Sequence, residues 1–139
     1  MKTTLDQDAI RNILPHRDVM LLCRTATVDG EGGASAELSL DDETWVRRLS
    51  CPHLYLVEAL AQLCGLALAG MRLAEGIGPS RGYLAEANEV EFSGTPAIGA
   101  TVGMDVEKVI SFGPLHRFQV TAECAGEVLV RGTLTVATA

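Results

Sequence analysis

The longest continuous pattern in the chain is apolar and helical. From about Pro52 to Glu75 apolar residues fall on nearly every face of a helical projection, and only Glu58 and Gln62 interrupt the first half. The length of this stretch and its content of Ala, Leu and Met predict one long helix, which ends at the turn signal GIGPSRG. A helix that is apolar on nearly all sides has to be buried by other elements.

Elsewhere apolar and polar residues alternate with the period of a β-strand. A Gly-rich turn at residues 29–33 separates VMLLCRTATVDG from ASAELSL, and this arrangement predicts a hairpin. A short helix is expected after Thr4 and Asp6, ending at Pro15. Three or four further strands are predicted, in the segments at residues 82–92, 100–110, 115–124 and 127–137. The sequence therefore predicts an α+β fold, a single domain over residues 1–139, in which a curved antiparallel sheet wraps a central helix.

Composition and charge exclude several classes of function. The chain has 139 residues, a net charge of −7 and a pI near 4.8, so it lacks the basic stripe of a nucleic-acid binder. Its cysteines and histidines have no zinc-site spacing, and no GxGxxG or P-loop occurs. We therefore expect no metal and no tightly bound cofactor. The N-terminus carries no apolar stretch typical of a secretory signal, which predicts a cytoplasmic location.

A membrane span is the alternative interpretation of the long apolar segment. Its length is nearly sufficient to cross a bilayer. However, Glu58 and Gln62 lie within it, and the amphipathic strands need this helix as their core. We therefore expect the helix to lie inside the protein and to span no membrane.

Several motifs resemble one protein family. ILPHRDVMLL begins at Ile13, PHLYLVEALAQ spans Pro52 to Gln62, GYLAEANEVEF follows the helix, and FGPLHRFQVTAECAGEVLVRGTLTVA closes the chain. Together they resemble the β-hydroxyacyl-acyl carrier protein dehydratases, which have the hotdog fold. The resemblance implies a homodimer whose two sheets join edge to edge, with larger assemblies of dimers left open. It also implies a substrate that is an acyl thioester of acyl carrier protein or coenzyme A.

The resemblance identifies candidate catalytic residues but is incomplete. In the family a helical acid works with a histidine from the partner subunit. Glu58 matches the acid, whereas Thr44 stands where the family's spacing places the histidine. His53 replaces a family glycine and is the nearest candidate for a second catalytic group, because a histidine can act as a neutral base near the start of a helix. The free N–H groups of the first helical turn are candidates for polarising the thioester carbonyl.

Further residues are predicted to bind the substrate. Trp45 and Thr44 would line the mouth of the acyl channel, and two arginines near the expected entrance would attract an acidic carrier or phosphate groups. Glu58 also has a purely structural alternative, a hydrogen bond with Gln62 one helical turn away. The predicted substrate-binding residues are Leu54, Tyr55, Gln62, Thr44, Trp45, Arg47 and Arg48.

Three functions remain open at this level. The first is a dehydratase-like enzyme acting on 3-hydroxyacyl thioesters in fatty acid or polyketide-type lipid metabolism. The second is a thioesterase on the same fold, with Glu58 activating water. The third is a non-catalytic acyl-thioester-binding protein, or a subunit that needs another chain for catalysis. The fold itself cannot choose among them, because one scaffold supports several chemistries.

Overall fold

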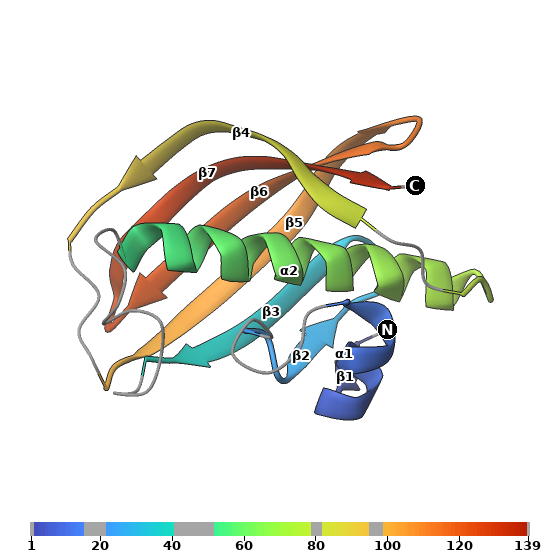
Figure 1. The fold of residues 1–139 in the computed structure, drawn as a ribbon, viewed down its shortest axis with the longest axis horizontal. Coiled ribbons are helices and arrows are strands. Elements are labelled where there is room, and N and C mark those ends of the chain that lie inside the picture. The colour runs from blue at the N-terminus through green and yellow to red at the C-terminus, as the bar shows by residue number, and fades with distance from the viewer. Residues whose placement is uncertain (1, 16–21, 41–51, 79–81, 95–98, 139) are drawn as a thin grey trace.

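The computed structural model describes residues 2–15, 22–40, 52–78, 82–94 and 99–138. A long helix lies in the concave face of one antiparallel sheet, which curves around it (Figure 1). The strand order is β1-β2-β3-β5-β6-β7-β4. This is the hotdog arrangement predicted from the sequence.

The elements agree closely with the predicted ones. The helices are α1, Gln7–Ile13, and α2, Pro52–Ala74. The strands are β1 (Thr3–Leu5), β2 (Ala26–Val28), β3 (Gly33–Ser39), β4 (Gly82–Phe92), β5 (Thr101–Phe112), β6 (Leu115–Cys124) and β7 (Glu127–Thr138). Asp6 caps α1, accepting a hydrogen bond from the Ala9 N–H at 2.9 Å, as the sequence predicts for an aspartate before a helix.

The C-terminus of α2 is fixed by a glycine with a left-handed backbone. Gly76 has a φ of 74°, its N–H donates to Leu73 O, and the Ile77 N–H donates to Arg72 O at 2.8 Å. This pair of bonds is a Schellman motif, which satisfies carbonyls that have no partner within the helix. The Arg72 Nε adds a bond to Gly78 O at 2.7 Å.

Burial explains why α2 is apolar around most of its circumference. Its side chains Leu56, Leu60, Leu63 and Leu66 are fully buried against the sheet. By length and hydropathy α2 also qualifies as a candidate membrane span, but 67% of its apolar stretch is buried inside the protein. This burial is typical of a core helix.

Two N-terminal predictions need correction. Residues 22–25 were expected within a strand, but in the described part of this segment the strand β2 begins only at Ala26. The reason is that the backbone N–H groups of Leu22 and Cys23 donate to the side chain of Gln62, in place of a neighbouring strand. The prediction also missed β1, which pairs Thr3 with Val28.

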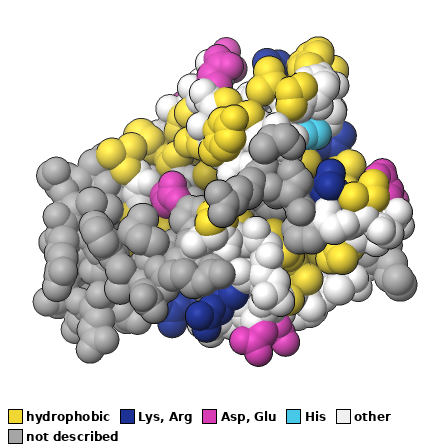
Figure 2. Space-filling view, turned by 45° about the vertical axis from the view of Figure 1, so that its right-hand side comes forward, with side chains coloured by type: hydrophobic (Ala, Val, Ile, Leu, Met, Phe, Trp, Pro, Cys, Tyr) yellow, Lys and Arg dark blue, Asp and Glu magenta, His cyan; other side chains and the backbone are white. Residues whose placement is uncertain are grey.

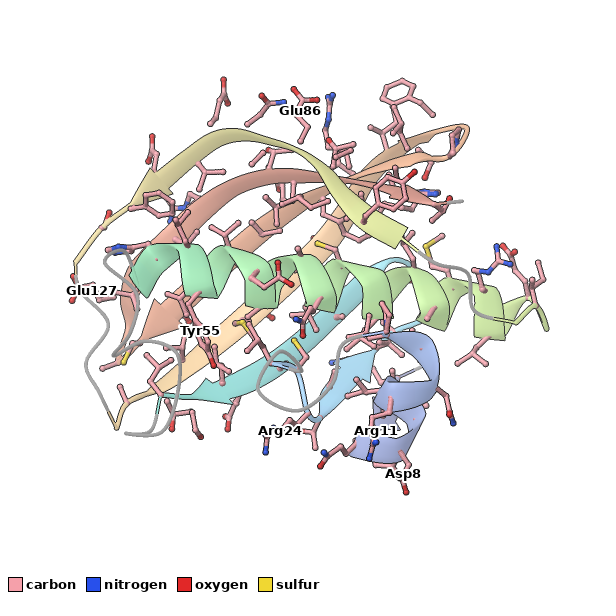
Figure 3. All side chains as sticks on the ribbon, in the orientation of Figure 1. Asp8, Arg11, Arg24, Tyr55, Glu86 and Glu127 are labelled. Atoms are coloured by element: carbon pink, nitrogen blue, oxygen red, sulfur yellow. The ribbon has the colours of Figure 1, made fainter. Side chains whose placement is uncertain are left out.

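Strand β4 forms an edge of the sheet. It pairs with β7 on one side and is partly or fully exposed along its entire length. In Figure 3 the side chain of Glu86 points away from α2 on the outer side of β4. A long edge strand whose backbone groups face solvent is a site for pairing with another chain.

Candidate functional site

One face of α2 carries a stripe of polar and small residues that lines a cavity. Glu58, Gln62, Gly65, Ala69 and Arg72 follow one another at spacings of four and three residues, so they share one side of the helix. The cavity has a volume of about 320 Å³. Its remaining walls come from the C-terminal end of α1, the start of β4 and the end of β7: Ile13, Leu14, Pro15, Gly82, Tyr83, Leu84, Val136 and Thr138. The volume lies within the range of small-molecule sites.

Gln62 holds the Glu58 carboxyl in place. Its Nε2 donates to Glu58 Oε1 at 3.2 Å, while its Oε1 accepts the N–H groups of Leu22 at 2.9 Å and Cys23 at 3.3 Å. Gln62 is only 2% exposed. A buried amide with partners on both atoms has one fixed orientation. The partly buried Glu58 therefore presents its carboxyl to the cavity from a fixed side.

The Cys23 thiol lies close to this carboxyl. Its Sγ donates to Ala59 O at 3.3 Å. Burial, and secondarily the charge of Glu58, raise the pKa of Cys23 to about 12. The thiol therefore stays protonated at physiological pH and is a poor nucleophile. Cys64, also buried, has its pKa raised by burial as well.

The structure does not bring His53 and Glu58 together. Glu58 stands five positions after His53 on α2, which places them roughly 140° apart around the helix axis. The Nε2 of His53 donates to Gly94 O at 2.9 Å, and its ring packs against Phe92 with centroids 5.0 Å apart. His53 thus ties the start of α2 to the end of β4.

The other predicted binding residues have different positions. Leu54 lies one turn before Glu58 on the same side of α2 and is 58% exposed. Tyr55 is buried, and Figure 3 shows it on the side of α2 opposite β4. Thr44, Trp45, Arg47 and Arg48 lie outside the described residues.

The sequence-based site omitted the far end of the cavity. Arg72 lines that end together with Tyr83 and Thr138. Arg72 stands fourteen residues after Glu58, close to four helical turns, so helical spacing alone would have placed both on one face. No spacing in the sequence relates Tyr83 and Thr138 to Glu58, since they lie on β4 and β7, and only the pairing of these two strands brings them together beside the helix.

The described part of the cavity can supply one proton-transferring carboxyl, an apolar passage and a cation. Glu58 is the only carboxylate among the described residues that line it. Among the residues that the structure describes, no group of three His, Cys, Asp or Glu side chains is placed to hold a metal ion. The chemistry that such a site offers is acid–base catalysis or ligand binding.

Comparison with solved structures shows the same fold in proteins of low sequence identity. The dehydratase heterocomplex ApeI:P from Xenorhabdus doucetiae contains a chain with a TM-score of 0.77 and 19% identity, over 94% of this chain and 90% of that one. A hypothetical thioesterase with coenzyme A from Streptococcus pneumoniae has a TM-score of 0.59 and 12% sequence identity, over 78% of this chain and 80% of that one. The Escherichia coli PaaI protein from the phenylacetic acid degradation operon has a TM-score of 0.62 and 9% sequence identity, over 78% of this chain and 74% of that one.

Sequence comparison gives the family. No curated protein sequence matches the chain. The model of the ApeP-like family, described as ApeP dehydratase, matches residues 8–139. The matched region includes α1 from Asp8 onward, the Glu58 stripe on α2 and all the strands from β2 to β7. The chain therefore belongs to the ApeP-like dehydratase family.

Proposed function

We propose that this protein dehydrates 3-hydroxyacyl thioesters, carried by acyl carrier protein or coenzyme A, in cytoplasmic fatty acid or polyketide-type lipid metabolism. The observation that carries the proposal is the position of Glu58, whose carboxyl is oriented by Gln62 on the wall of a cavity of about 320 Å³. Membership of a dehydratase family supports it.

The reaction needs two proton transfers. A base removes a proton from C2 of the acyl chain, the C3–O bond breaks, and the departing hydroxyl takes up a proton to leave as water. Glu58 performs both steps: its carboxylate accepts the C2 proton, and the resulting carboxylic acid donates that proton to the leaving hydroxyl. The products are the 2-enoyl thioester and water, and the carboxylate is regenerated.

The position of His53 favours a mechanism in which the Glu58 carboxyl alone performs both proton transfers. Its ring nitrogen donates to Gly94 O at the end of β4, and it lies on a different side of α2 from Glu58. His53 therefore orients the start of the helix. The N–H groups of that first turn have no acceptor within the helix, and the positive end of the helix dipole lies there. We place the thioester carbonyl towards this end, where developing negative charge on its oxygen is stabilised.

We further propose that β4 pairs with β4 of a second copy of this chain. Exposed apolar side chains on β4 include Tyr83, Leu84 and Phe92. Figure 2 shows hydrophobic side chains gathered in the upper part of the molecule, where Figure 1 places β4 and the β5–β6 hairpin. An antiparallel pairing centred on Ala87 would set Glu86 opposite Asn88, so that no two acidic residues stand directly opposite each other.

The pairing would extend the sheet across both subunits and is tested by the state of association. Sedimentation equilibrium should show a dimer, and replacement of an edge residue with proline, Ala87→Pro, should give monomers, because proline cannot donate to a strand. A dimer that persists in Ala87→Pro would contradict pairing through β4.

A single assay with two readouts tests the activity. The protein is incubated with 3-hydroxyacyl and 2-enoyl thioesters while enoyl absorbance and free thiol are followed together. The proposal expects interconversion of the two thioesters without thiol release, and its loss in Glu58→Gln. Thiol release would instead show a thioesterase, and an acyl thioester that binds without reaction would show a non-catalytic binding protein.

A further inference from the structure

The end of the cavity far from Glu58 differs in chemistry from the rest. The middle is lined by small and apolar residues of α2, β4 and β7, whereas Arg72, Tyr83 and Thr138 stand at the far end. The protein carries a net charge of −7 with only 11 basic residues, so a cation that faces a cavity is a distinctive feature. A cation at the end of an apolar passage is suited to an elongated ligand with a terminal anion.

Arg72 has donors to spare for such an anion. Its Nε donates to Gly78 O at 2.7 Å, which steadies the turn after α2. A guanidinium carries further N–H donors in a planar fork that matches the geometry of a phosphate or carboxylate. The bond to Gly78 therefore fixes the orientation of the side chain without using all its donors.

A second cation is linked to the same end by a chain of hydrogen bonds. Lys108 Nζ donates to Ser111 Oγ at 3.0 Å, Ser111 Oγ lies 2.9 Å from His116 Nδ1, and His116 Nε2 lies 3.4 Å from Thr138 Oγ1. Thr138 in turn donates to Pro114 O. One assignment of protons satisfies every contact: Ser111 donates to Nδ1, and neutral His116 donates to Thr138. The chain thus fixes the Thr138 hydroxyl beside the cavity and places a positive charge behind it.

The distance between Glu58 and Arg72 along α2 restricts which ligands can reach both residues. The Cα atoms of Glu58 and Arg72 are separated by about 21 Å along the helix axis, at about 1.5 Å per residue. A ligand that reaches both side chains is therefore elongated, and its anionic end lies near the turn at Gly78, to which Arg72 Nε donates. A 4′-phosphopantetheine arm has about 13 bonds between phosphorus and sulfur and extends over roughly 15 Å, using the rise of an extended chain.

We propose that Arg72 binds the phosphate of the substrate's 4′-phosphopantetheine arm, and that the arm lies along the stripe from Arg72 to Glu58. The thioester is then beside Glu58, and the acyl chain continues past Leu54, the exposed apolar residue one turn earlier on the same side of α2. This inference rests on the proposed function for the identity of the thioester but concerns a different residue and a different end of the cavity. The same arm belongs to coenzyme A and to acyl carrier protein.

Calorimetric titration with 4′-phosphopantetheine and with pantetheine, which lacks the phosphate, tests the inference without any turnover. The wild-type protein should bind the phosphorylated form at least tenfold more tightly. Arg72→Gln should reduce this ratio to within twofold. Arg117→Gln is the matched control, because Arg117 lies over the Phe112 ring and outside the cavity, so the ratio should be retained. Equal binding of both ligands to the wild type, or equal losses in the two variants, would overturn the inference.

Kinetics separate this inference from the proposed function. Arg72→Gln should raise KM for a coenzyme A thioester by a factor at least five times larger than for the N-acetylcysteamine thioester of the same acyl group, which has no phosphate. If the wild type prefers phosphopantetheine but turns over neither thioester, the phosphate site stands and the dehydratase proposal fails. Titrations with coenzyme A and with holo-acyl carrier protein then identify which of them carries the arm, since the physiological carrier binds more tightly. Binding of either one that is weakened by Arg72→Gln supports the inference.

Discussion

Replacing Gln62 with leucine tests whether this side chain organises the site. Leucine keeps the approximate volume but removes the acceptor for two backbone N–H groups and the donor to Glu58. The N–H groups of Leu22 and Cys23 are buried, so they cannot turn to water without local opening. The variant should therefore lose stability and the fixed orientation of the Glu58 carboxyl together.

The hydrogen bonds set the expected magnitude. A buried donor left without an acceptor costs about 1–3 kcal/mol. The bond from Leu22 is 2.9 Å long and the bond from Cys23 is 3.3 Å, so the second contributes less, and we expect a total loss of about 3 kcal/mol. For a chain of this length, that loss lowers the Tm by roughly 10 °C.

Urea denaturation followed by circular dichroism measures this loss. Gln119→Leu is the control, since Gln119 is an exposed residue of β6, and its unfolding free energy should stay within about 0.5 kcal/mol of the wild type. If Gln62→Leu unfolds at the same urea concentration as Gln119→Leu, the Gln62 hydrogen bonds do not hold the segment at Leu22 and Cys23, and the reasoning is refuted.

Three further predictions concern stability. The unfolding free energy should fall between pH 9 and pH 12, because the Cys23 thiol has its usual pKa of 9.0 in the unfolded chain and a pKa of about 12 in the folded protein. Urea denaturation at a series of pH values gives the slope of unfolding free energy against pH, and Cys23→Ala should reduce this slope by about 1.4 kcal/mol per pH unit. An unchanged slope would contradict this cause. Gly70→Ala should be less stable than Gly65→Ala by about 1–3 kcal/mol in the same assay, since an added Cβ would meet Val28 Cγ2 at 2.8 Å, and equal stabilities would refute this contact. Thr135→Val should raise the Tm, because the buried Thr135 hydroxyl has no hydrogen-bond partner among the described residues; a lower Tm would show that the hydroxyl is satisfied.

The fold could be predicted from local patterns, because most of its helices and strands show the periodicity of apolar and polar residues that is typical of their type. Strand β4 occupies the predicted residues, and α2 ends one residue before the predicted boundary. Patterns failed where a contact distant in sequence decided the structure. The apolar run at Leu22 and Cys23 has strand-like residues, but its N–H groups bond to Gln62, forty and thirty-nine residues further along the chain. No local pattern reports such a partner.

The candidate site was predictable to a lesser degree. Glu58 and Gln62 were recognisable as polar residues one turn apart in an apolar helix, and the structure joins them. His53 was adjacent in sequence to the helix start, yet its orientation depended on Gly94 and Phe92, which only the fold brings near. Arg72 was within reach of helical periodicity, while Tyr83 and Thr138 required the strand pairing.

Glu58→Gln offers the most direct test of the central claim, that one oriented carboxyl performs the dehydration. Turnover of a 3-hydroxyacyl thioester is measured for the wild type and the variant, together with the Kd of each for the saturated acyl thioester. We predict a fall in kcat of about 100-fold or more, the usual contribution of a general acid–base, with the Kd unchanged within about twofold. Turnover by the variant close to the wild-type rate, with substrate still bound, would contradict the account.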